Sequence, residues 1–196
     1  MIPTLPLGPR NRLAALILAA LSDAGARREL AALAGCERTL AGDWLGADEP
    51  RHAEALRARA RRASGAIAAL PLATPEPSLG VALDAAATLH DAGLYFEVHE
   101  LLEPYWARAG GAAKETLQGL IQVAVGYQHL ANGNLRGARA LLEEGRRRLH
   151  GRALGLDLDT FAGAVARSLD RLTDLAESDV PPFPRAHADS RRHTGG

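Results

Sequence analysis

The sequence predicts an all-α protein, an antiparallel helical bundle of about five helices with an N-terminal helical extension. Val, Ile and Thr, which favour strands, are sparse, and apolar residues recur at spacings of three and four. Glycines and asparagines stand where such segments end, as they do after helices. A length of 196 residues suits one domain with a small appendage.

Residues 1–75 are the predicted N-terminal extension and linker. Three prolines within residues 1–9 predict an irregular arm. We expect helices over residues 11–24, 26–34, 37–45 and 48–70. Asn11 would cap the first, whose apolar run from Leu13 is too short for a membrane span, which needs about 20 residues. Residues 71–78, PLATPEPS, contain three prolines and predict the linker.

The core domain is predicted over residues 76–177, with glycine after most of its helices. These helices should cover residues 79–91, 94–107, 113–131 and 134–149, followed by a fifth that starts at Asp159 or Thr160. The fifth carries an apolar face of Phe161, Val165, Leu169 and Leu172. The PPFP sequence and the Arg/His/Gly-rich ending predict a disordered tail over residues 178–196.

Charge and composition restrict the function. Basic and acidic residues number 23 each, which argues against a general nucleic-acid or membrane-surface binder, and we expect neither partner. The arginine-rich run at residues 51–62 would suit RNA or an acidic partner, but a solvated helix face is favoured. Only Lys114 is lysine, a bias typical of a GC-rich, bacterial genome. Cys36 is the single cysteine, so no internal disulfide forms, and a cytoplasmic location is expected.

The densest group of ionisable and aromatic residues is GLYFEVHELLEPYW, residues 93–106. On a helical wheel His99 and Glu103 are neighbours, with Trp106 on one side and Phe96 on the other. This arrangement predicts that both ionisable side chains are at least half buried. Glu97 falls nearest the opposite side of the wheel.

A second segment, residues 114–130, should pack against the first. It has almost no solvent face and is therefore expected to be central in the bundle. Gln118, Gln122 and His129 share a narrow stripe beside Gly119 and Gly126, where another backbone can approach closely. A buried amide without a partner costs about 1–3 kcal/mol. We therefore expect the glutamines to bond to the polar residues of the first helix, His99, Glu100 and Glu103.

GLYFEVHELLEPYW followed by LQGLIQVAVGYQHLANGNLRGA resembles the domain-of-unknown-function 309 family, over residues about 80–150. Two elements carry the resemblance, His-Glu-x-x-Glu-x-x-Trp and Leu-Gln-Gly-Leu-Ile-Gln. It implies a small all-helical fold and no established activity. The pattern maps onto Phe96, His99, Glu100, Glu103, Trp106, Gln118, Gly119, Gln122 and Gly133.

Several functions suit these residues. The favoured one is non-catalytic binding of a protein partner or small ligand around a buried His/Glu/Gln cluster. The ligand-binding candidates are Phe96, His99, Glu100, Glu103, Trp106, Gln118, Gln122 and His129. The same groups could simply form a hydrogen-bond network that fixes helix register. The alternative is a metal-assisted or acid–base hydrolase that uses His99 with Glu103 and Glu100.

We expect no cofactor and no metal, because His-Glu-x-x-Glu is not the His-Glu-x-x-His of zinc proteases. No catalytic residue can be assigned, since no serine or cysteine nucleophile stands near the cluster. The remaining histidines are predicted at the surface or in the tail: His52, His90, His150, His187 and His193. Trp44 is expected to pack the N-terminal helices.

Overall fold

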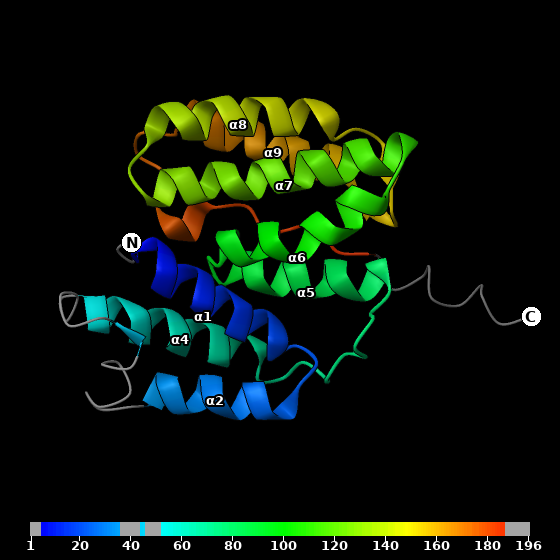
Figure 1. Ribbon diagram of the computed structural model, residues 1–196. Coiled ribbons are helices and arrows are strands. Elements are labelled where there is room, and N and C mark those ends of the chain that lie inside the picture. The colour runs from blue at the N-terminus through cyan, green and yellow to red at the C-terminus, as the bar shows by residue number, and fades with distance from the viewer. Residues whose placement is uncertain (1–4, 36–43, 46–51, 187–196) are drawn as a thin grey trace, which may run out of the picture. The chain divides into compact units, whose positions relative to one another are not determined.

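Eight α-helices and one short hairpin form the regular structure of the part of the chain that the computed structural model describes, residues 5–35, 44–45 and 52–186 (Figure 1). The prediction of an all-α fold is confirmed. The predicted helix over residues 37–45 lies almost wholly outside the described residues, as do Cys36, Asp48 and the chain beyond residue 186. The chain divides into two units, Met1–Pro77 (unit 1) and Ser78–Gly196 (unit 2).

Unit 1 packs three helices against one another: α1 (Leu7–Ala19), α2 (Ala24–Gly35) and α4 (Ala53–Ile67). Their apolar faces form its core, with the fully buried side chains Leu13, Ile17, Leu30, Leu56 and Ile67. Trp44 is also buried, and the Arg12 guanidinium lies 4.0 Å from its ring centroid. On the outer face of α4, Arg57 and Arg61 pair with Glu54 at 2.9 and 2.6 Å, an arrangement typical of a solvated helix face.

One arginine joins three parts of unit 1. Arg27, in α2, donates from Nε to the Ala20 carbonyl (3.0 Å) and from Nη1 to the Leu70 carbonyl (2.8 Å). These carbonyls lie just beyond the ends of α1 and α4. Helix ends leave carbonyl groups without partners, so the guanidinium satisfies main-chain acceptors at two chain reversals.

The start of α1 differs from the prediction. The helix begins at Leu7, directly after Pro6, and Asn11 lies inside it instead of capping it. Pro9 is tolerated because it falls in the first turn, where backbone N–H groups have no helical acceptor. The irregular arm predicted over residues 1–9 therefore becomes helical from residue 7.

Unit 2 begins with α5 (Leu79–Asp91), α6 (Tyr95–Arg108), α7 (Gly111–Ala131) and α8 (Leu135–Arg148). Ser78 caps α5 and Asn134 caps α8, the latter by accepting from the Gly137 N–H at 2.9 Å. The chain reverses between α7 and α8 at Gly133, whose φ of +75° is readily adopted by glycine. The four predicted helices thus agree with the structure to within about two residues at each end.

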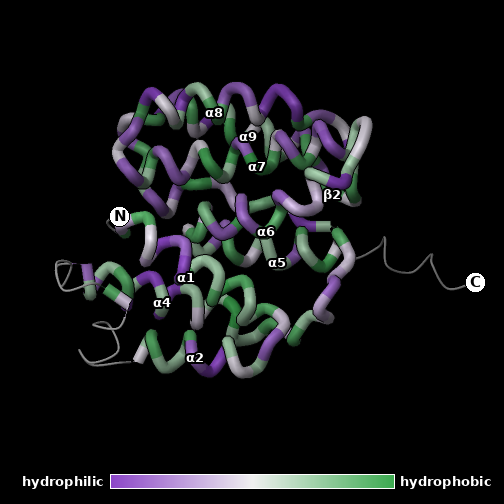
Figure 2. Tube along the Cα trace, viewed as in Figure 1, coloured by the Kyte–Doolittle hydropathy of each residue, from purple (hydrophilic) through white to green (hydrophobic). Residues whose placement is uncertain are grey.

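Helix α7 is the centre of unit 2, as predicted. It packs against α6 on one side and α8 on the other (Figure 1). Gly119 and Gly126 face α8, and a Cβ at Gly119 would lie 2.9 Å from the Gly145 carbonyl oxygen. The backbones can approach this closely because these positions lack side chains. Helix α8 turns its hydrophilic residues outward (Figure 2).

Two features follow α8. A hairpin of β1 (Arg152–Ala153) and β2 (Leu156–Asp157) turns through Leu154 and Gly155, both at positive φ. Helix α9 (Leu158–Asp170) starts at the Asp157 cap, two residues before the predicted start, and buries the predicted side chains Phe161, Val165 and Leu169. The hairpin was not predicted, because two-residue strands are too short to show an alternating pattern.

The segment after α9 differs from the predicted disordered tail. A short 3-10 helix, η2 (Glu177–Asp179), leads into residues 180–186, which lie against unit 2. Phe183 within this segment is 2% exposed. The prolines around Phe183 suggested disorder, but burial of its ring favours an ordered position. Among the described residues, every helix is too short or too polar to cross a membrane.

Candidate functional site

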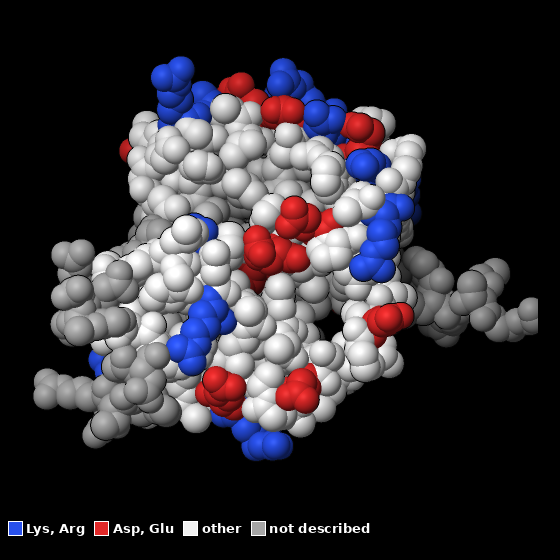
Figure 3. Space-filling model, viewed as in Figure 1, with Lys and Arg blue, Asp and Glu red and all other residues white. Residues whose placement is uncertain are grey.

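Helix α6 carries a His/Glu cluster on its exposed side. His99 Nδ1 lies 2.9 Å from Glu100 Oε1, and ligand-type atoms of His99, Glu100 and Glu103 all lie within 4.8 Å of one another. The helix brings them together because Glu103 lies one turn beyond the other two, at i+4 from His99 and i+3 from Glu100. We call these three residues the α6 triad. Figure 3 shows acidic side chains gathered over α6.

The α6 triad is partly exposed, and His99 within it is more than half buried, as predicted. The His99 side chain is 30% exposed and the Glu100 side chain 38% exposed, and Glu103 is also exposed. The buried face of α6 instead contains Tyr95, Val98 and Leu102, and Glu97, predicted far from the core, is fully buried. Helix α6 contacts both α5 and α7, so more than one side of it is covered. A wheel that assumes one covered side therefore misplaced Glu97.

Aromatic residues flank the α6 triad without enclosing it. The Phe96 ring centroid lies 6.3 Å from that of His99, and both side chains are partly exposed. Trp106 interacts instead with Lys114 at the start of α7, with the ammonium nitrogen 4.6 Å from the ring centroid. The predicted aromatic walls are therefore present near the triad, but Trp106 is engaged in a cation–π contact.

The glutamines of α7 were predicted to bond to the α6 triad, but Gln122 bonds to α8 instead. Gln122 Oε1 accepts from Arg148 Nε at 3.0 Å. The same guanidinium pairs with Glu115 and, at 3.0 Å, with Glu144. Gln122 thus belongs to a clamp between α7 and α8, because its stripe faces α8 and not α6. Gln118, on the same stripe, is partly buried.

His129 is not part of either group. Its Nδ1 lies 2.9 Å from Asn134 Nδ2, at the junction of α7 and α8. The single converging His/Glu/Gln cluster that the sequence suggested therefore separates into the α6 triad, the Arg148 clamp and this junction. Of the predicted ligand-binding residues, the structure brings together Phe96, His99, Glu100 and Glu103.

The family comparison covers the part of the chain that holds these groups. Residues 83–141 match the family model described as Domain of unknown function (DUF309). This segment of the chain is similar to the DUF309 family. The resemblance to that family is thus confirmed, and the family description assigns no activity. No curated protein and no solved structure matches the chain significantly.

The DUF309 segment also contains a buried histidine that was predicted at the surface. His90, near the end of α5, is 1% exposed. Tyr95, Tyr127 and Phe161 approach it edge-on, with ring centroids 5.1, 5.8 and 6.3 Å from that of His90. A signal for its burial existed in the sequence, because His90 lies three, four and seven residues after the apolar positions Ala87, Ala86 and Leu83.

Burial dominates the protonation of this region. It lowers the pKa of His90, an effect that the adjacent Asp91 carboxylate only partly opposes. Burial also raises the pKa of Tyr127 to about 12, although its bond to Ser168 acts in the other direction. The interior beside the DUF309 helices α5 and α7 therefore holds neutral imidazole and neutral phenol at neutral pH.

Proposed function

We propose that unit 2 is a non-catalytic binding domain, and that the exposed side of α6 around the α6 triad binds a protein partner or small ligand through a cationic group. One observation supports this most: a partly exposed imidazole and two carboxylates present their polar atoms within 4.8 Å of one another. Such a group favours ammonium or guanidinium ions, which carboxylates bind by charge-assisted hydrogen bonds.

The exposure of the α6 triad argues against the alternative that these residues only form a structural hydrogen-bond network. A hydrogen-bond network that fixes helix register contributes most when it is buried, because unpaired groups there are costly. The triad side chains remain in contact with solvent. Their electrostatic contribution to folding is therefore small, which leaves the cluster free to serve recognition.

The first test is the stability of His99→Ala. Because exposed ion pairs contribute little, the free energy of unfolding should fall by less than about 1 kcal/mol. Chemical denaturation of wild type and variant measures this difference. A loss of several kcal/mol would instead favour the structural network.

The second test is a thermal-shift screen against amines, guanidines and nucleotides, followed by titration calorimetry of any hit. A ligand of the α6 triad should lose at least tenfold in affinity in Glu100→Gln/Glu103→Gln. Glu143→Gln, an exposed position on α8, is the matched control and should bind as wild type does. Equal affinity in the double variant, or a screen without hits, would count against the proposal.

A second candidate function is supported by the same distances. One imidazole nitrogen and two carboxylate oxygens are ligands for divalent cations, as a metal-assisted hydrolase using His99 with Glu103 and Glu100 requires. Calorimetry of tag-free protein with Zn²⁺ and Mn²⁺ tests it. Binding with 1:1 stoichiometry that His99→Ala abolishes would support a metal site, and absence of binding would remove the candidate.

A further inference from the structure

Residues 180–186 cross the end of unit 2 where His90 is buried. We call them the strap. The Phe183 ring lies 5.2 Å from the His90 ring and 5.7 Å from the Phe161 ring, measured between centroids. Pro181 is buried as well. The DUF309 match ends at residue 141, so the strap and Phe161 are contributed by chain outside it.

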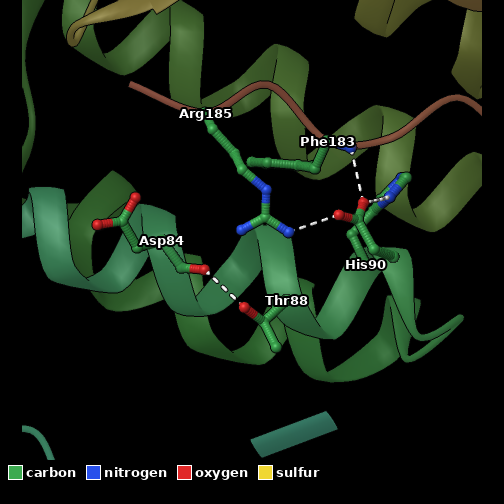
Figure 4. A network of polar contacts seen from close by, with 6 residues as sticks. Asp84, Thr88, His90, Phe183 and Arg185 are labelled. Atoms are coloured by element: carbon green, nitrogen blue, oxygen red, sulfur yellow. Dashed lines mark hydrogen bonds and ion pairs between the residues drawn. The ribbon is translucent and has the colours of Figure 1, made fainter. Parts of the chain in front are cut away.

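In Figure 4 a single carboxylate, that of Asp91, makes the polar contacts drawn to the strap. Asp91 Oδ1 accepts from the Phe183 N–H at 2.8 Å, and Oδ2 accepts from Arg185 Nη2 at 2.5 Å (Figure 4). Burial alone would raise the pKa of Asp91, but its contacts with His90, Phe183 and Arg185 outweigh this and hold the pKa below its usual value. Asp91 therefore stays ionised across the neutral and mildly acidic range.

His90 is an unusual group to cover with a phenyl ring. Among the described residues neither ring nitrogen has a hydrogen-bond partner, and Nδ1 is 3.6 Å from Asp91 Oδ1, beyond normal hydrogen-bond length. The titratable or charged groups that face His90 are Asp91 from its own helix, Tyr95 from α6, Tyr127 from α7 and Arg185 from the strap. Helix α9 contributes the uncharged residues Phe161 and Ser168.

An imidazolium at this position would be poorly solvated. It would gain attraction to Asp91, but a buried charge with an incomplete set of hydrogen bonds is costly. Water can reach the ring most readily if the strap leaves, because α5, α6, α7 and α9 are held by many other buried side chains. The strap contributes only Phe183 and Pro181 to the buried set.

We propose that residues 180–186 form an acid-released strap, in which protonation of His90 undocks Phe183 while the helices of unit 2 remain folded. Asp91 is the attachment point and His90 is the sensor. Release uncovers an aromatic pocket lined by His90 and Phe161, beside a carboxylate that has lost its arginine partner.

Acid should favour undocking because the pKa of His90 is lowered in the docked state. A histidine whose pKa is lowered in the docked state binds its proton more readily once undocked, so acid favours undocking. With the ordinary histidine pKa of 6.5 for the undocked state, the equilibrium constant for undocking should rise between pH 7.5 and pH 5.5, by at most about tenfold.

Hydrogen exchange of the Phe183 amide, which donates to Asp91, measures this equilibrium in the full chain, after correction for the intrinsic pH dependence of exchange. Wild type should lose protection between pH 7.5 and pH 5.5, by at most about tenfold, with unchanged far-UV circular dichroism. His90→Leu, which keeps a similar volume without a titrating group, should show equal protection at both pH values. Phe183→Ala should be unprotected at both.

Three results would overturn the proposal. They are equal pH dependence in wild type and His90→Leu, constant protection in wild type, and loss of helix together with loss of protection. If His90→Leu does not fold, an NMR titration of the His90 imidazole in wild type and Phe183→Ala decides. Removal of the phenyl ring should raise the His90 pKa towards 6.5, and an unchanged pKa would show that the strap and the histidine are not coupled.

Discussion

Tyr127 shows how one buried polar side chain joins distant parts of unit 2. Its ring is 1% exposed, and its hydroxyl donates to Ser168 Oγ at 3.1 Å, which connects α7 to α9. The Ser168 hydroxyl in turn donates to the Ala164 carbonyl oxygen, with 3.4 Å between the two oxygens. Both hydroxyls are therefore satisfied inside the core, where a group without a partner would be costly.

Tyr127→Phe should reduce the free energy of unfolding at neutral pH by about 0.5–1.5 kcal/mol, because one buried hydrogen bond is lost. The pH dependence is more specific. The raised pKa of about 12 means that stability is retained below pH 10 and lost as the pH rises towards 12. Denaturation between pH 9 and pH 12 should show a steeper decline for wild type than for the variant.

Tyr105→Phe is the control for alkaline titration. Burial raises the pKa of Tyr105 also, with Arg108 opposing, but its ring is only partly buried. We expect its alkaline decline to follow that of wild type. If Tyr127→Phe keeps the steep decline of wild type, the phenol of Tyr127 is not the group that titrates.

At the scale of elements, the α7–α8 pair depends on the absence of side chains. Gly119 and Gly145 face one another across it, and Gly126 faces Leu142. Arg148 then bridges the two helices by bonding to Gln122 and Glu115 on α7. The close approach of the two backbones therefore contributes more to the stability of this pair than the Arg148 clamp, because solvent weakens each ion pair at the exposed edge.

Gly119→Ala should destabilise unit 2 by about 1–3 kcal/mol, because the new methyl group would contact the Gly145 carbonyl and the Leu149 side chain. Gly163→Ala in α9 is the matched control, since among the described residues the new Cβ would have one atom within 4 Å, Arg167 Nη1 at 3.8 Å. The control should be neutral or stabilising by up to about 1 kcal/mol, as expected for alanine in a helix. Thermal unfolding of both variants checks this. Equal effects would mean that the pair can separate without cost.

The helices of unit 2 could be predicted because their limits are local. Ser78 and Asn134 cap the starts of α5 and α8, and Gly93 and Gly133 follow the ends of α5 and α7. These signals depend only on neighbouring backbone groups. The direction in which a helix turns its polar side is not local. The stripe of Gln122 suited α6 and α8 equally, and only the three-dimensional arrangement of α8 decided between them.

For the candidate site, too, local neighbours could be predicted from the sequence but burial could not. The spacing of His99, Glu100 and Glu103 predicts that they are near one another, since Glu103 lies four residues after His99 and three after Glu100 on one helix. Burial is a property of the surroundings, so His90 and Phe183, which are 93 positions apart in the sequence, could not be paired from periodicity alone. An apolar face around His90 was the one available signal.

For the whole molecule, the division into two units has a direct consequence for folding. Each unit has its own buried set, with Leu30 and Leu56 in unit 1 and Leu102 and Leu120 in unit 2. Residues 71–77, with three prolines, join them. Each unit therefore has the core that an independently folding domain requires.

A fragment of residues 78–196 should fold alone. We expect cooperative thermal unfolding and a near-UV circular dichroism spectrum from its tyrosines and Trp106. Calorimetry should show that the Gly119→Ala effect has the same size in the fragment as in the full chain. A fragment without fixed aromatic signals that binds a hydrophobic dye would contradict this independence.

Arg27 in unit 1 has a consequence for how sequences of this kind can vary. Its two acceptors are the main-chain oxygens of Ala20 and Leu70, which every amino acid would supply. Substitutions at these two positions keep the tie as long as the backbone path is retained. A lysine at position 27 would not replace it, because one ammonium group lacks the forked geometry that reaches two acceptors at once. Three stretches of chain are thus constrained through the identity of a single amino acid.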